Sequence, residues 1–134
     1  MPVVGINFAS VEGRKKDSKN AGEININSTP KVSAVKEVTL PGIEQKALAM
    51  TFEFVTSYEP DIGGITITGE IFYTGEGNKQ LLKKWEKDKK LPEDVSAEIL
   101  NHLFRRCLIK IANLAEDLQL PPPIQIPRVR PKQQ

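Results

Sequence analysis

His102 and Cys107 are the one histidine and the one cysteine of this sequence, and they are its only candidates for a thiol–imidazole pair. Nucleophilic catalysis by such a pair requires the two side chains to lie within hydrogen-bond reach. The apolar periodicity around them predicts a helix, on which residues five positions apart point roughly 140° away from each other. Because Cys107 belongs to the apolar arc of that helix and His102 to its polar side, we expect a buried, inert thiol and an exposed imidazole.

Metal and phosphate sites have equally little support. A zinc site needs three or four cysteine, histidine or carboxylate ligands at set spacing, and the sequence contains no such group. The segment from Gly75 to Lys79 precedes a predicted helix, but it lacks the G-x-x-x-x-G-K-[ST] pattern of a phosphate-binding loop. A glycine turn that leads into an N-cap at Asn78 explains it better. We therefore expect no enzyme activity, no metal and no cofactor.

Charge is nearly balanced, because 19 basic and 17 acidic residues among 134 give a formal net charge of +2. Specific nucleic-acid binders usually concentrate their positive charge. The basic clusters at residues 14–16 and 79–90 are not interleaved with aromatic residues, and Asp17, Glu86 and Asp88 lie among them. A solvated surface explains these clusters better than RNA binding, which stays a less favoured alternative.

The sequence also bears on the compartment. A single cysteine excludes an internal disulfide, so a reducing cytosol is the expected environment. The first twelve residues lack the basic start and the long apolar run of a signal peptide. The longest near-apolar stretch, from Cys107 to Ala115, is far too short to span a membrane. We expect a cytoplasmic protein without membrane insertion.

Glycine positions divide the chain into two parts, since all nine glycines lie at or before Gly77. The first part is rich in Val, Ile, Thr and Phe with period-two alternation, which predicts strands and turns. The remainder carries Leu, Ile and Lys at helical spacing. Strands followed by helices predict an α+β fold, here a four-stranded antiparallel sheet covered on one face by a long helix. The expected strands cover residues 3–13, 24–40 with an interruption at Pro30, 48–55 and 65–73, and Val4, Ile6 and Phe8 should share one face of the first.

Two helices and a tail complete the predicted fold. Asn78 should cap a short lysine-rich helix over residues 79–90. A longer helix should begin with Pro92 at its first position and run to about Leu118, with its apolar arc covering the sheet. Half of all prolines fall in the last fourteen residues. We therefore expect one domain over residues 1–120 and an extended, proline-rich tail over 121–134.

Two apolar residues stand outside this scheme. Ile109 falls on the polar side of the long helix, and Phe72 on the outward face of the last strand. Single exposed apolar residues are common, but together with Leu120, Ile124 and Ile126 of the tail they could form a contact surface. Partial cover by the chain's own tail is the alternative, and the sequence leaves both open.

Three segments resemble the SecB family of export chaperones. The strand Gly64–Ile71 is similar to the glycine-bounded "GIF-I-G" strand of that family. Leu103–Arg106, within the helix, is similar to the "LFP-AR" start of its principal helix, although no proline follows Phe104. The segment from Leu120 to Pro127 is similar to its "FPPL-L-PV" crossover. The lysine-rich helix is an addition to the family pattern, so the resemblance is to a divergent member, archaeal or associated with a toxin–antitoxin system.

The resemblance implies a homo-oligomer, a dimer or tetramer, that holds unfolded polypeptides or preproteins in apolar grooves without ATP. The first strand and the principal helix would then build the oligomer, through Val3, Val11 and Ile109. We expect the client polypeptide to contact seven residues, namely Phe72, Tyr73, Trp85, Ile109, Leu120, Ile124 and Ile126. The alternative from another functional class is an adaptor or scaffold of the same fold that binds one folded protein partner.

Overall fold

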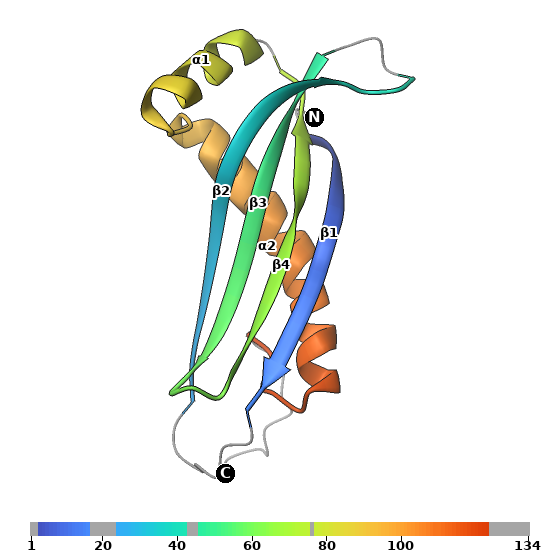
Figure 1. Ribbon diagram of the computed structural model, residues 1–134, viewed down its shortest axis with the longest axis vertical. Coiled ribbons are helices and arrows are strands. Elements are labelled where there is room, and N and C mark those ends of the chain that lie inside the picture. The colour runs from blue at the N-terminus through green and yellow to red at the C-terminus, as the bar shows by residue number, and fades with distance from the viewer. Residues whose placement is uncertain (1–2, 17–23, 43–45, 76, 124–134) are drawn as a thin grey trace, which may run out of the picture.

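Four antiparallel strands form one twisted sheet, and two helices follow them in the chain (Figure 1). The computed structural model describes residues 3–16, 24–42, 46–75 and 77–123. The elements are β1 (Val3–Lys15), β2 (Asn25–Thr39), β3 (Lys46–Glu59), β4 (Gly63–Tyr73), α1 (Asn78–Asp88) and α2 (Glu93–Asp117). The order across the sheet is β1-β4-β3-β2, so β1 and β2 are the edge strands. The predicted α+β class and the four-stranded antiparallel sheet are confirmed.

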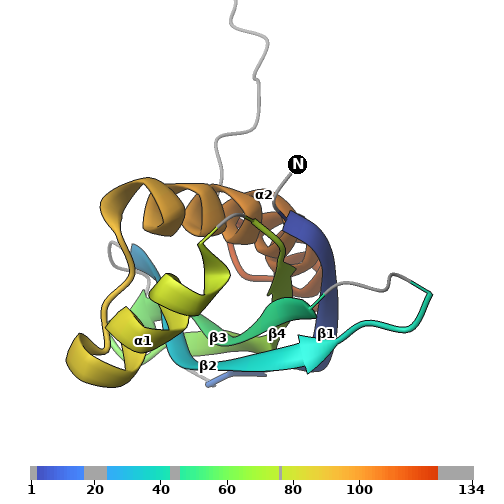
Figure 2. The same ribbon diagram turned by 90° about the horizontal axis from the view of Figure 1, so that it is seen from above.

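The two central strands carry the core because their alternation puts one row of apolar side chains on the inner face. Phe52 and Phe54 of β3 and Ile67 and Ile71 of β4 are fully or almost fully buried. Helix α2 lies across this face (Figure 2). Its buried residues recur at every fourth position, and they are Val95, Ile99, Leu103, Cys107, Ile111 and Ala115. Four residues turn a helix by about 40° more than one full turn, so the buried line drifts around α2 as the helix crosses the twisted sheet.

Pro30 does not interrupt β2, contrary to the expectation. The strand continues through it, and Pro30 lies opposite Phe54 of β3. Proline lacks the backbone N–H that a central strand must donate on both sides, but an edge strand leaves alternate N–H groups unpaired. The position of β2 at the sheet edge therefore removes the conflict, and the sequence of β2 alone does not reveal that position.

The first strand also differs from the expectation. A register shift between Val3 and Gly5 inserts one residue opposite β4. An inserted residue of this kind exchanges the faces of the strand on its two sides. Val3, Ile6 and Phe8 therefore pack against the core, whereas Val4 is 43% exposed. The predicted grouping of Val4 with Ile6 and Phe8 is wrong for this reason.

Both helices begin one residue away from the predicted cap. Gly77, with φ of +83°, precedes α1, and Asn78 is its first residue, whose Nδ2 donates to the Tyr73 carbonyl at 3.4 Å. In α2, Pro92 is the N-cap rather than the first helical residue. Its carbonyl accepts a hydrogen bond from the Ser96 N–H at 2.8 Å. A left-handed φ is available to glycine at little cost, so Gly77 makes this turn and Asn78 does not cap the helix.

Candidate functional site

The two flanks of α2 differ in chemistry. On one flank, the ring of Phe104 meets the ring of Phe54 edge-on, with 5.3 Å between centroids. On the other flank, Lys110 Nζ lies 4.5 Å and Arg106 Cζ lies 5.8 Å from the ring centroid of Phe8 on β1. Residues two positions apart on a helix point in nearly opposite directions. The flank with Phe104 therefore faces β3 and β2 with apolar groups, and the flank toward β1 is basic.

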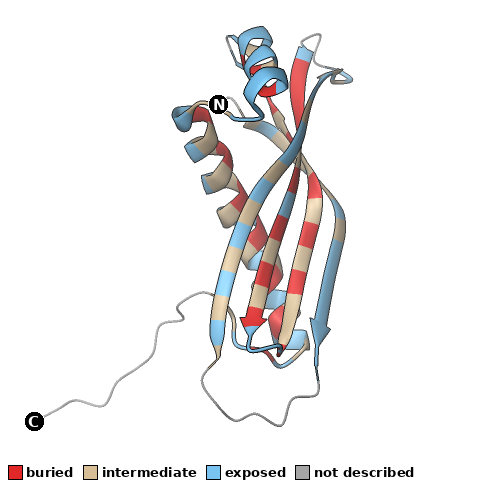
Figure 3. Cartoon of the chain, turned by 60° about the vertical axis from the view of Figure 1, so that its left-hand side comes forward, coloured by how far each residue is buried: buried red, intermediate tan, exposed pale blue. Residues whose placement is uncertain are grey.

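An apolar surface runs along the side of α2 that faces β2. Three inner-face residues of β2, namely Ile26, Val32 and Val35, pack against the core and remain half-exposed, as do Phe104 and Leu108 of α2. We call these five residues the β2–α2 seam. Half-exposed and exposed residues alternate along β2 in Figure 3. The inner face of this edge strand is thus apolar, and α2 covers it only in part. Exposed apolar surfaces of this kind are typical of sites that bind another chain.

The outer edge of β2, called here the free edge, pairs with no other strand among the described residues, so it adds unpaired backbone groups to this surface. An edge strand presents N–H and C=O groups that an extended peptide can pair with. The nitrogen of Pro30 must face the free edge, because a proline nitrogen facing β3 would break the ladder. Lys31 and Lys36 are exposed on the same strand, and charges of this kind discourage uncontrolled edge-to-edge pairing. The edge therefore admits an added strand but restricts its register.

The segment after α2 lies at the end of the seam that is formed by Ile26. Leu120 is buried, at 5% exposure, and the carbonyl of Pro121 accepts a hydrogen bond from the Tyr58 hydroxyl at 2.8 Å. Tyr58 lies opposite Ile26 in the β2–β3 pairing. Burial raises the pKa of the Tyr58 hydroxyl above its ordinary value. The hydroxyl therefore stays a donor at physiological pH and fixes the place where the chain leaves the core.

Of the seven residues expected to contact a client, the five that the structure describes do not form one surface. Tyr73, Trp85 and Leu120 are core residues, with exposures of 7%, 7% and 5%. Phe72 is half-exposed on the outer face, and Ile109 is 62% exposed on the solvent side of α2. The two remaining positions, Ile124 and Ile126, lie outside the described residues. The sequence does not reveal the seam, because its residues follow the same apolar pattern as buried core residues. They stay half-exposed because α2 crosses the sheet diagonally and does not cover them.

The three residues expected at an oligomer interface are also dispersed. Val3 is half-exposed and packs against the core from β1. Val11 is 42% exposed near the other end of the same edge strand, and Ile109 lies on α2. Their participation in an oligomer stays a prediction.

Catalytic chemistry finds no support at the two residues that the sequence offered for it. Cys107 is fully buried, and burial raises the pKa of its thiol from 9.0 to about 11, against the opposing effect of Lys110 and Arg106. His102 is half-exposed rather than exposed, beside the start of β1. Within the described ranges, no group of three histidine, cysteine, aspartate or glutamate residues could hold a metal ion. The thiol is accordingly protonated and shielded at neutral pH.

Cys107 gives a direct test of this core. We expect a thiol reagent at pH 8 to label the native protein only at the rate of unfolding. Between about pH 9 and 11 the unfolded thiol ionises and the folded one does not, so wild-type stability should fall relative to the Cys107→Ala variant over that range. Urea unfolding of both proteins at several pH values measures the difference. Rapid stoichiometric labelling of the native protein would contradict the assignment.

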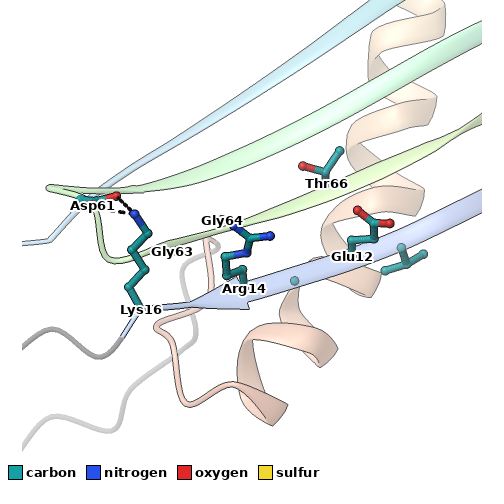
Figure 4. Close-up of a pocket in the computed structure, with 9 residues that line it drawn as sticks. Glu12, Arg14, Lys16, Asp61, Gly63, Gly64 and Thr66 are labelled. Atoms are coloured by element: carbon teal, nitrogen blue, oxygen red, sulfur yellow. Dashed lines mark hydrogen bonds and ion pairs between the residues drawn. The ribbon is translucent and has the colours of Figure 1, made fainter.

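A polar hollow lies on the outer face of the sheet, where β1 ends and β4 begins (Figure 4). Its volume is about 710 Å³, and its lining includes Glu12, Arg14 and Thr66. Lys16 Nζ and an Asp61 carboxylate oxygen form an ion pair at 2.8 Å across its rim, with both side chains largely exposed. An exposed pair of this kind contributes at most about 1 kcal/mol. The hollow has none of the buried, convergent groups that a catalytic site needs.

No helix in the described part of the chain has the length and apolar character needed to cross a membrane.

No protein-family model matches the sequence, and no curated protein matches it. A solved structure does match, that of the Mycobacterium tuberculosis Rv1957 SecB-like chaperone in complex with a ChAD peptide from the Rv1956 HigA1 antitoxin. The TM-score is 0.54 at 13% identity, over 97% of this chain and 91% of that chain.

The chain has a SecB-like fold. The three segments that carried the family resemblance differ in how they meet the expectation. Gly64–Ile71 lies in β4 as expected, whereas Leu103–Arg106 lies in the middle of α2 rather than at the start of a helix. Leu120 begins the segment that follows α2, and positions 124–127 of that segment lie outside the described residues. At 13% identity the fold is shared while most side chains differ, so the SecB-like fold here is a divergent version.

Proposed function

We propose that this SecB-like protein is an ATP-independent holdase that binds unfolded or precursor polypeptides along the β2–α2 seam. The observation that carries the proposal is the coincidence of a half-exposed apolar strip with a free strand edge, at Ile26, Val32 and Val35 of β2. An unfolded chain offers apolar side chains and unpaired backbone groups, and the seam can satisfy both without chemistry. The fold supports the same conclusion, because a similar structure is that of a chaperone with a bound peptide.

Oligomerisation belongs to this proposal. An apolar strip on one chain is short, and several strips on one particle would bind a long client at high effective concentration. Val11 and Ile109, both exposed, and the half-exposed Val3 are the residues we assign to contacts between copies. Phe72 and Ile109 remain candidates for outlying client contacts. We expect the particle to work in the cytoplasm, without a cofactor.

Two measurements on the full chain test the holdase proposal. We expect light scattering to give a mass that is a multiple of 14.9 kDa, and we expect substoichiometric amounts of the particle to suppress aggregation of a chemically denatured model enzyme without ATP. Bovine serum albumin at equal mass is the control for non-specific protection. A monomer without effect on aggregation would overturn the proposal.

Ile109 favours a second candidate function, the binding of one folded protein partner. Its side chain is 62% exposed, and Arg105 and Asn113, one turn away on either side, are exposed as well. An adaptor of this kind would leave denatured clients unprotected and would retain a single protein from a lysate. The Ile109→Glu variant should then lose that protein, whereas a holdase should still protect its clients unless its oligomer dissociates.

A further inference from the structure

A small cavity opens on the basic side of α2, opposite the seam. It lies between the start of β1 and the first half of α2, and its volume is about 190 Å³. Val3, Ile6 and Ile71 supply an apolar floor, and His102 and Arg106 lie at its rim. Sites for whole drug-sized ligands have volumes of roughly 300–1,000 Å³. This cavity therefore has room for one residue-sized group with an apolar part and a polar end.

Arg106 gives the rim a positive charge, and no ion pair within the described residues neutralises it. The ion pairs in the described part of the chain are Lys16–Asp61 and Lys46–Glu37, so neither His102 nor Arg106 forms one there. The Arg106 guanidinium lies over the face of the Phe8 ring, at 5.8 Å from its centroid. A guanidinium held over a ring face keeps the N–H groups of its edge free for a carboxylate. Stacking on Phe8 thus holds the Arg106 guanidinium in place, and its N–H donors remain available to a ligand.

Two neighbouring features fit an anionic guest. Glu98 lies one turn before His102 but does not line the cavity. Its negative charge acts on the Tyr73 hydroxyl, whose pKa is raised by burial and, to a smaller extent, by Glu98. The register shift between Val3 and Gly5 leaves Val4, at the cavity wall, without a partner in β4. The backbone groups of a residue inserted in this way stay outside the ladder. They can therefore pair with the backbone of a bound chain.

We propose that this cavity binds the C-terminal residue of a polypeptide, with an apolar side chain on the floor and the α-carboxylate at Arg106 and His102. A terminal residue carries its carboxylate on the same carbon as its side chain, so both fit within one small cavity. An internal aspartate or glutamate would require the chain to continue on both sides, and a fatty acid would extend beyond the floor. The proposal rests on the proposed function, because client polypeptides supply the ligand, and it adds a preference for free chain ends.

Fluorescence anisotropy with the full chain tests it. The probe is a labelled heptapeptide that ends in leucine, prepared with a free carboxylate and with a C-terminal amide. We expect the acid to bind about tenfold more tightly than the amide, as one charge-assisted pair predicts. Arg106→Gln should reduce the affinity for the acid to that for the amide. Arg105→Gln is the matched control, since Arg105 is exposed and outside the cavity lining, and it should leave the preference intact.

Further arms identify the source of the carboxylate. An amidated peptide with an internal glutamate and octanoate should both compete poorly with the terminal acid. Equal binding of acid and amide would overturn the proposal, as would effective competition by octanoate or an equal loss in Arg105→Gln. His102→Gln provides a second rim variant, which should also weaken the acid selectively. Protection of denatured clients is measured on the same proteins, so loss of the acid preference with intact protection refutes this site and leaves the holdase function standing.

Discussion

The double variant Ile26→Thr/Val32→Thr is expected to lose most of the protection that the wild-type protein gives to a denatured client. Both side chains are half-exposed on the inner face of β2, and threonine keeps the β-branched shape that strands favour. Each methyl or methylene group removed from an apolar contact costs about 0.8 kcal/mol. Ile26→Thr removes a methylene and a methyl group, and Val32→Thr removes one methyl group, each change leaving a hydroxyl. Three such losses amount to about 2.4 kcal/mol, which weakens client binding roughly fiftyfold. Aggregation of the client, followed by turbidity at several chaperone concentrations, measures the effect.

The control carries a valine-to-threonine change on the outer face of the sheet. Val55 of β3 is half-exposed and alternates with the buried Phe54 and Thr56, so Val55→Thr removes an apolar group without touching the seam. We expect this control to protect clients as the wild type does, at unchanged particle mass in light scattering. Equal loss in the control and the double variant, at equal particle mass and thermal stability, would place the client elsewhere than on β2.

Replacing Gly69 by alanine is expected to destabilise the protein by about 3 kcal/mol, at the upper end of the usual cost of overpacking. A Cβ atom at this position would lie 2.2 Å from the carbonyl oxygen of Asn7 and 3.0 Å from Phe52 Cζ. Neither neighbour can give way easily, because Asn7 contributes backbone to the β1–β4 pairing and Phe52 is a core ring. The alanine must therefore push β1 away from β4. Urea unfolding followed by circular dichroism measures the change.

Gly5 provides the control for Gly69, since it pairs with Phe72 in the same β1–β4 ladder. A Cβ atom there would meet nothing nearer than Phe72 Cδ2 at 3.8 Å, which is an ordinary contact. Gly5→Ala should accordingly change stability by well under 1 kcal/mol, or raise it slightly by restricting the unfolded chain. Equal losses in the two variants would show that the close approach at Gly69 is not what limits alanine.

The central strands and the long helix could be predicted from the sequence because the burial of apolar side chains dominates there. In β3 and β4, burial of alternate residues agrees with β propensity, so pattern and propensity give the same answer. The same agreement holds for α2, where apolar residues at helical spacing meet acids in the first turn. The resemblance of three short segments to one family was sufficient to predict a SecB-like fold, although whole-chain identity to the matched structure is 13%.

The parts that could not be predicted depend on tertiary placement. Pro30 is compatible with a continuous strand only because β2 lies at the edge, and the inserted residue at Val4 is visible only in the pairing with β4. Tyr73 and Trp85 were expected among the client contacts, and both are instead buried. The half-exposed residues of the β2–α2 seam are the ones that we propose for this role. The diagonal course of α2 across the sheet decides which apolar side chains remain exposed to solvent. No local sequence pattern encodes that course.

Hydrogen exchange on β2 tests the central claim most directly. The N–H groups of Ser28 and Val32 point the same way as the nitrogen of Pro30, and therefore toward the free edge. In the free protein they pair with none of the strands that the structure describes. The full chain is exchanged with and without an excess of a permanently unfolded client, and individual amides are followed by nuclear magnetic resonance. The holdase account predicts slower exchange at Ser28 and Val32 when the client is present. Unchanged exchange at both amides under saturating client would contradict it.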